Sequence, residues 1–156
     1  MKSLCYDVLK ALKGRTLATA ESCTGGGIGA AITAVPGSSA VFKGGIISYC
    51  NEIKSSMLGV GDDILTTYGA VSAPVAEAMA AGARNTLQAD TAVSVTGLAG
   101  PGGDEFGNPV GTVYIGYASA DKVFSAHYLF AGTRDEIREQ AIKAALTLII
   151  KMSGDN

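Results

Sequence analysis

The sequence has few of the residues that build metal sites and histidine-dependent triads. Among 156 residues there are one histidine and three cysteines. A serine-histidine-aspartate triad would have to use His127, and a metal site made of histidines is excluded. Cys5, Cys23 and Cys50 are odd in number and have no paired spacing, which indicates free thiols rather than a disulfide framework or a zinc site. We therefore expect neither a metal nor a cofactor.

Charge and long apolar runs are also scarce. Only 17% of the residues are charged, the net charge is -2 and the isoelectric point is near 5.3, so the chain has no basic footprint for nucleic acid or for an anionic membrane. No apolar run is long enough to span a bilayer. The N-terminal segment includes Tyr6 and Asp7, which interrupt the apolar run that a signal peptide needs. These features predict a cytoplasmic protein that binds neither nucleic acid nor membrane.

Apolar residues, by contrast, are plentiful, at 47% of the chain. The length indicates a single domain over residues 1–156, and a domain of this size buries about 70% of the surface that its unfolded chain exposes. An apolar fraction this high, with so little charge, favours further buried surface in a homo-oligomer.

The most informative stretch runs from Ala18 to Gly29. An apolar strand pattern ends in Glu21, Ser22, Cys23 and Thr24, and three glycines then lead into a helix. Unpaired N–H groups at the start of that helix could hold an anion beside a hydroxyl and a thiol, as an acyl-transfer site requires. The alternative is a glycine-rich turn that only packs a helix against a sheet.

The remaining patterns predict a three-layer α/β/α sandwich with a mixed sheet. Strands are expected at 16–20, at 40–49 as a nearly continuous apolar and therefore buried strand, at 91–96, and at 110–119 and 123–130 as a hairpin. Helices are expected after a Ser3 cap, over 28–35, from an Asn51 cap through Met57, after a Ser72 cap, and after a capping box between Thr133 and Glu136. The segments at 59–70, with one helical turn, and at 97–109 read as loops.

Two candidate residues have competing interpretations. His127 lies in an alternating strand, where an edge or surface position is its ordinary role. Lys54 follows the second strand, and groups at strand ends gather at one edge of an α/β sheet, so Lys54 could face Ser22. A lysine desolvated there could accept the serine proton as a general base, although a solvated helix lysine is the more common case.

Seven separate stretches carry recognisable motifs, in this order along the chain: 19–26, 36–40, 48–54, 68–72, 96–103, 109–113 and 132–134. Together they resemble the C-terminal domain of the competence-damage-inducible CinA family. The resemblance extends from Thr16 nearly to the C-terminus. The sequence departs from the family pattern at Cys50, where a serine is expected.

This resemblance implies a nicotinamide-nucleotide amidohydrolase in its stand-alone form, which converts nicotinamide mononucleotide and water to nicotinate mononucleotide and ammonia. The implied partner is thus a small nucleotide substrate. The resemblance makes Ser22 the expected nucleophile and Lys54 its base, with Tyr49 and Ser39 relaying or orienting the proton. The expected substrate-binding residues are Thr24, Gly25, Gly26, Thr96, Gly97, Ala99, Gly100 and Arg134.

Three alternatives stay open at this level. Cys23 competes with Ser22 as nucleophile, but on an extended segment only one of the two would face the substrate. The N–H groups of residues 24–26 could stabilise an oxyanion or hold the phosphate, and Arg134 and the loop at 97–103 also suit the phosphate and ribose. Finally, the same loops could belong to a nucleotide-binding or assembly module without catalysis.

Overall fold

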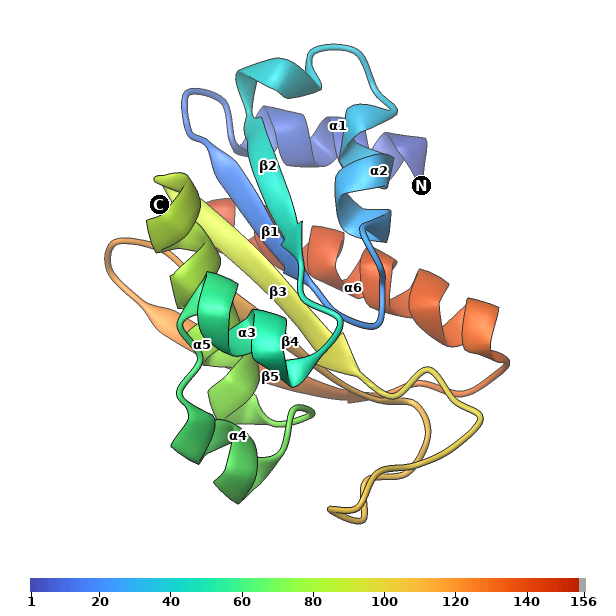
Figure 1. Cartoon of the computed structure of the whole chain (residues 1–156). Coiled ribbons are helices and arrows are strands. Elements are labelled where there is room, and N and C mark those ends of the chain that lie inside the picture. Colours follow the sequence, from blue (N-terminus) through green and yellow to red (C-terminus); the bar gives the residue numbers. More distant parts are fainter. Residues whose placement is uncertain (155–156) are drawn as a thin grey trace.

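A five-stranded mixed sheet forms the centre of the protein in the computed structural model, which describes residues 1–154 (Figure 1). The order of the strands is β2-β1-β3-β4-β5. β1 pairs in parallel with β2 and β3, whereas β4 is antiparallel to β3 and to β5. The predicted mixed sheet and the hairpin at its end are thereby confirmed. The strands are β1 (Leu17–Glu21), β2 (Phe42–Ile47), β3 (Thr91–Gly97), β4 (Thr112–Ala118) and β5 (Val123–Leu129).

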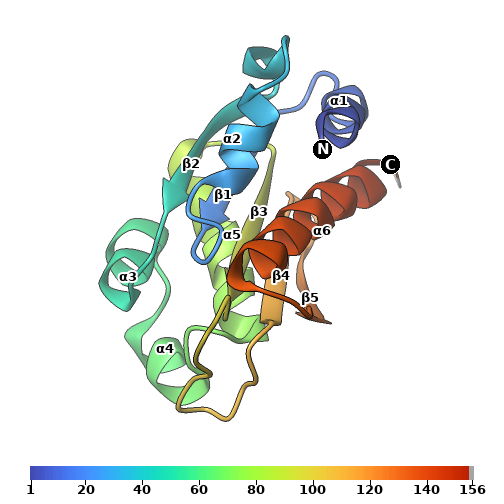
Figure 2. The same ribbon diagram turned by 90° about the vertical axis from the view of Figure 1, so that its right-hand side faces the viewer.

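Helices cover both faces of the sheet, which confirms the three-layer sandwich (Figure 2). One face carries α1 (Lys2–Ala11), α2 (Gly27–Thr33) and α6 (Arg134–Gly154), and the other carries α3 (Asn51–Leu58), α4 (Asp62–Tyr68) and α5 (Ala73–Leu87). A short 3₁₀ helix spans Ser38–Ala40. No helix within the described residues is both long and apolar enough to cross a membrane.

Each face of the sheet has its own apolar core. Fully buried side chains such as Val8, Ile115 and Leu146 pack between the sheet and α1, α2 and α6. A second cluster, which includes Val75 and Met79, packs between the sheet and α5. Each buried side chain of this kind contributes about 1.5–3 kcal/mol relative to leaving it exposed. The two cores hold the central strands, and therefore the strand ends, in fixed positions.

The prediction that the second strand is buried is wrong. β2 lies at the edge of the sheet, its residues alternate between half-buried and exposed, and Ile47 is 55% exposed. An edge strand is covered less well than a central one, and the glycines within it carry no side chain to bury. The apolar run therefore reflected composition rather than position in the sheet.

Two expected helix caps are also wrong, whereas the other two lie at the positions predicted for them. Helix α1 begins at Lys2, so Ser3 lies inside it, and Asn51 is the first residue of α3 rather than its cap. Ser72 is the N-cap residue of α5, as expected, although its hydroxyl donates to the carbonyl of Gly69 and does not bind an amide of the helix. At α6 the capping box forms: the Thr133 N–H donates to Glu136 Oε1 at 3.0 Å, and the Glu136 N–H to Thr133 Oγ1 at 3.3 Å.

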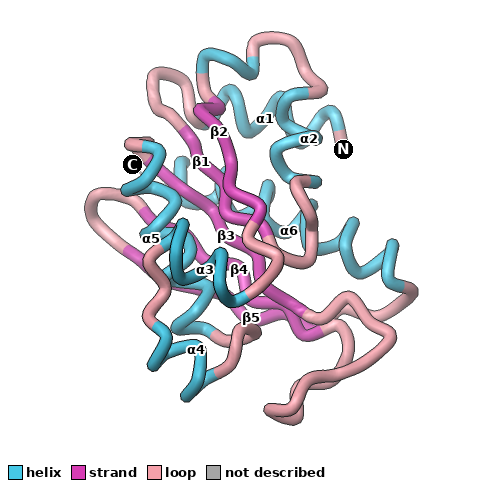
Figure 3. Tube along the Cα trace, viewed as in Figure 1, coloured by secondary structure: helices cyan, strands magenta, loops and turns pink. Residues whose placement is uncertain are grey.

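The loops differ in how closely they match their predictions (Figure 3). The segment at 59–70 forms a seven-residue helix, α4, where one helical turn was expected. The segment between Gly97 and Pro109 contains neither a helix nor a strand, as predicted. Asp104 holds this loop together, because it accepts hydrogen bonds from the amides of Phe106 and Asn108 and from the Asn108 side chain.

Helix α3 packs directly against α5 at Gly82. A Cβ atom added at this position would overlap the carbonyl oxygen of Leu58, the last residue of α3, so the two backbones touch. Because α3 carries Lys54, the absence of a side chain at Gly82 allows the close approach of α3 to α5 on which the placement of that lysine depends.

Gly82→Ala should therefore destabilise the protein by about 1–3 kcal/mol, since a backbone atom must move to admit the methyl group. Urea unfolding measures this difference. Gly154→Ala is the matched control, because a Cβ at Gly154 meets nothing within 4 Å. Equal stability of the two variants would show that α3 is free to shift.

Candidate active site

Ser22 lies where the C-terminal ends of the three parallel strands β1, β2 and β3 meet. It follows β1 directly, and its amide donates to the carbonyl of Val95 on the neighbouring strand β3 at 3.0 Å. The segments that follow β2 and β3 emerge at the same edge, which is where ligand sites form in open α/β sheets. The serine thus occupies a rigid position with loops on both sides.

Lys54 meets Ser22 from helix α3. Its Nζ lies 3.1 Å from Ser22 Oγ and donates to the carbonyl of Ser48 at 2.8 Å. The side chain is only 2% exposed, and it forms no ion pair within residues 1–154. Burial lowers the pKa of Lys54 below its ordinary value of 10.5. The structure therefore brings together the expected nucleophile and the expected base, with the base in an environment that favours its uncharged form.

Glu21 fixes the turn that carries Ser22. Its carboxylate is buried and accepts hydrogen bonds from the amides of Ile28 and Gly29 at 2.8 and 3.1 Å and from the Thr24 hydroxyl at 2.7 Å. The anion at the start of α2 is thus part of the protein itself. The amides at the start of α2 are therefore not open to an external anion, because the carboxylate satisfies those of Ile28 and Gly29 and offsets the helix dipole. Among residues 24–26, the Gly25 amide is also engaged, because it donates to the carbonyl of Ser22.

Cys23 also borders the site. The chain turns after β1 instead of continuing as an extended strand, so Ser22 and Cys23 line the same cleft, contrary to the expectation that only one would do so. Burial raises the pKa of the Cys23 thiol to about 11, even though Arg138 and Lys54 act in the opposite direction. A thiol that stays protonated is a poor nucleophile, which favours Ser22.

A cleft of about 220 Å³ opens above these residues. The Arg134 guanidinium crosses its rim, where it donates to Tyr49 Oη at 3.0 Å and to the carbonyl of Gly100. Tyr49 thus contacts Arg134 rather than Ser22 or Lys54. The lining residues are Ser22, Cys23, Tyr49, Gly97, Leu98, Ala99, Gly100, Gly102 and Arg134.

Five of the expected site residues lie elsewhere. Ser39 belongs to the 3₁₀ helix before β2, at the opposite end of the strands from Ser22, so the structure does not bring it to Lys54. The Thr24 and Thr96 hydroxyls are engaged by Glu21 and by the carbonyl of Ala70. Gly25 and Gly26 form the turn into α2 and do not line the cleft. Their expected contacts with the substrate have no support in this geometry.

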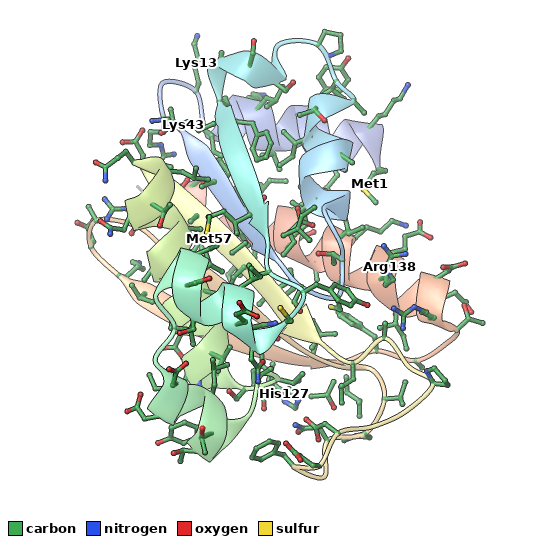
Figure 4. The ribbon with its side chains drawn as sticks, in the orientation of Figure 1. Met1, Lys13, Lys43, Met57, His127 and Arg138 are labelled. Carbon is green, nitrogen blue, oxygen red and sulfur yellow. The ribbon has the colours of Figure 1, made fainter. Side chains whose placement is uncertain are left out.

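Two supporting residues escaped the sequence reasoning. Glu21 read as a polar strand end, and only its burial reveals it as the anchor of the turn. Arg138 projects from α6 towards the same turn, and it donates to the carbonyls of Cys23 and Thr24 at 3.0 and 3.2 Å (Figure 4). The signal for Arg138 was its position one turn after Arg134 on a predicted helix.

His127 takes no part in this site. It lies on β5, the edge strand at the opposite side of the sheet from β2 (Figure 4). Its exposed ring stacks on the ring of Tyr114, with 4.8 Å between the two ring centroids. Its predicted edge position is confirmed. Within the described residues, no group of three or more histidine, cysteine or acidic side chains is arranged to hold a metal ion.

Comparison with known protein sequences identifies the family to which the chain belongs. The family model described as the CinA C-terminal domain matches residues 1–153. A CinA-like protein of Mycolicibacterium gilvum is 48% identical over 144 residues, which are 92% of this chain and 34% of that protein. One from a Cyanothece species is 52% identical over 133 residues, 84% of this chain and 32% of that protein. The chain thus spans about a third of the length of these curated relatives.

Solved structures match over nearly their whole length. A CinA superfamily protein from Klebsiella pneumoniae is 30% identical, with a TM-score of 0.96 over 99% of this chain and 98% of that one. A competence/damage-inducible protein, CihA, from Agrobacterium tumefaciens is 40% identical, with a TM-score of 0.93 over 97% and 94% of the two chains. By sequence and by fold, the chain belongs to the CinA C-terminal domain family.

Proposed function

We propose that this domain hydrolyses the carboxamide of a nicotinamide nucleotide, giving nicotinate mononucleotide and ammonia from nicotinamide mononucleotide. The observation that carries the proposal is the contact between Ser22 and a buried lysine that has no acidic partner among residues 1–154. Because no carboxylate in this part of the chain holds Lys54 in its charged form, its amine is available as a base at a lower pH than that of an ordinary lysine.

The hydrogen bonds of Lys54 suit this role. The carbonyl of Ser48 accepts one N–H of the amine, and Ser22 Oγ lies 3.1 Å from Nζ. An uncharged amine keeps one lone pair, which can accept the proton of the Ser22 hydroxyl at this distance. As Ser22 Oγ forms a bond to the amide carbon, its proton passes to Lys54. Lys54 then returns this proton to the departing nitrogen, and ammonia leaves an acyl-serine. Water then gives a proton to the same lysine and attacks the ester carbon. The bond from this carbon to Ser22 Oγ breaks, and Lys54 returns the proton to Oγ, which frees the carboxylic acid and restores both residues.

The cleft offers donors for the oxygen atoms of such a substrate. Ala99 and Gly100 line it, and the amide of neither residue has a hydrogen-bond partner among residues 1–154, so both can donate to a ligand. Arg134 adds the only cationic side chain among the lining residues. We assign the substrate phosphate to Arg134, because its planar fork can bind two phosphate oxygens once it releases Tyr49 and Gly100.

Arg134→Ala should raise the KM for nicotinamide mononucleotide about 10- to 100-fold, as expected for lost charge-assisted hydrogen bonds. Hydrolysis of nicotinamide riboside, which lacks the phosphate, should change little. Arg134→Lys should restore part of the loss, since lysine keeps the charge but not the fork. Lys13→Ala, at the opposite end of β1, is the control for a lost cation. Equal losses with both substrates would limit Arg134 to a structural role.

The alternative, a nucleotide-binding module without catalysis, would need only the loop amides and Arg134. It would gain nothing from a buried lysine, because desolvating an amine costs stability. Ammonia release, assayed on a panel of nucleotide carboxamides, separates the two functions. Binding of the nucleotide without ammonia release would favour the module.

A further inference from the structure

A second polar cavity lies at the opposite end of the sheet from Ser22. It has a volume of about 240 Å³ and is bordered by the first residues of β3, the last of β4 and the C-terminal turns of α5 and α6. In Figure 1 the glycine-rich loop after β3 and the turn between β4 and β5 mark the two ends of the sheet. The side chains that bear on its chemistry are Arg15, Arg84, Asp90, Tyr117, Asp121 and Lys122.

The three cations of this cavity form no ion pair with its carboxylates. Within residues 1–154 the only ion pair joins Lys143 and Glu139, on the surface of α6. Asp90 Oδ2 instead accepts hydrogen bonds from the Thr16 amide at 2.8 Å and from the Thr16 hydroxyl at 3.1 Å, which lower the pKa of its carboxyl, and the charge of Arg84 lowers that pKa further. Three cations and two carboxylates leave the cavity with a formal charge of +1.

Arg15 and Arg84 each use only one guanidinium nitrogen in hydrogen bonds to the described residues. Arg15 uses one nitrogen, Nη2, to bind the carbonyls of Ala11 and Ser153, at the ends of α1 and α6, at 2.9 and 3.1 Å. Arg84 uses Nε to bind the carbonyl of Asp90 at 3.0 Å. The two contacts of Arg15 place its positive charge at the C-terminal ends of α1 and α6, where the helix dipole is negative. The other guanidinium nitrogens form no hydrogen bond with any described residue.

Tyr117 adds a hydroxyl that has no hydrogen-bond partner within the described part of the protein. The residue is 2% exposed and lines the cavity, and its hydroxyl is open to the cavity rather than sealed in the core. Burial of the side chain raises the pKa of Tyr117, so the phenol keeps its proton at neutral pH. The hydroxyl can therefore donate to a ligand in the cavity that accepts hydrogen bonds.

We propose that this cavity binds a phosphate group, either as inorganic phosphate or as part of a small phosphorylated metabolite. A tetrahedral oxyanion presents several acceptor oxygens at once, which matches donors converging from Arg15, Arg84, Tyr117 and Lys122. The site is separate from the Ser22 cleft, and it does not depend on the function proposed for that cleft.

The test is an amide NMR titration of the full chain with inorganic phosphate, at constant ionic strength set by chloride. We expect saturable shifts at Arg84, Thr91 and residues 119–122. Arg84→Gln should weaken this binding about tenfold and Tyr117→Phe several-fold, while Lys2→Gln, which removes a cation elsewhere, should not change it. Tyr117→Phe keeps the ring that packs on Phe124, so its fold is retained.

Two further measurements distinguish the second cavity from the Ser22 cleft, and free phosphate from a phosphorylated metabolite. Arg134→Ala should remove any phosphate-induced shifts at the Ser22 cleft and leave those at the second cavity unchanged. Tighter binding of ribose 5-phosphate than of inorganic phosphate would identify a phosphorylated metabolite as the ligand, and the reverse would identify free phosphate. Shifts confined to the Ser22 cleft, or equal affinities for Arg84→Gln, Tyr117→Phe and Lys2→Gln, would overturn the proposal.

Discussion

Lys54→Met should lower the kcat for ammonia release from nicotinamide mononucleotide by about 10²- to 10⁴-fold, the usual contribution of a general base. Methionine fills nearly the same volume but cannot accept the proton of Ser22. Binding of the nucleotide should persist, because Lys54 lies beneath the cleft and is not among the residues that line it. An unchanged kcat would remove Lys54 from the mechanism.

The same variant should be at least as stable as the wild type, which separates lost chemistry from lost folding. A buried amine without an anionic partner costs free energy that an apolar side chain does not. A lysine in the unfolded chain titrates near 10.5, and burial lowers the pKa of Lys54 in the folded protein. The stability advantage of Lys54→Met should therefore grow as the pH falls from 10.5 towards that lowered pKa, and level off below it. Urea unfolding at several pH values measures it.

Ser22→Ala should reduce kcat further, by about 10⁴-fold or more, since no acyl intermediate can form. The turn should keep its shape, because Glu21 and Arg138 hold its backbone and neither contacts the Ser22 hydroxyl. The variant should therefore still bind the nucleotide, as isothermal titration calorimetry can show.

Cys23→Ala is the matched control for the nucleophile. The thiol lines the same cleft, but its raised pKa keeps it protonated, so its loss should leave most of the activity. An inactive Cys23→Ala protein together with an active Ser22→Ala protein would transfer the nucleophile to the thiol.

Patterns within the sequence identified most of the fold. Apolar periodicity located every strand and the long helices, and the capping box located the start of α6 to the residue. Periodicity says little about which strand lies at an edge, because edge position depends on strand order. The apolar segment of β2 therefore looked like a central strand although its side chains alternate between half-buried and exposed.

The candidate site was predictable to the extent that strand ends determine it. Ser22, Lys54 and the loop at 97–103 meet because parallel strands deliver them to one edge. The prediction that Ser39 lies near Lys54 is wrong, because Ser39 precedes β2 and therefore lies at the opposite end of the strands from Ser22. The role of Glu21 depends on which amides its buried carboxylate reaches, and that information is three-dimensional.

The central claim, that Ser22 and Lys54 act as one proton-transfer unit in carboxamide hydrolysis, is tested most directly by a double-mutant cycle. Ammonia release from nicotinamide mononucleotide is measured for the wild type, Ser22→Ala, Lys54→Met and the double variant. If the two residues act together, the double variant should be scarcely slower than Ser22→Ala alone, because the base has no purpose without the nucleophile. Losses that multiply, or a wild-type protein that releases no ammonia from this nucleotide, would contradict the account.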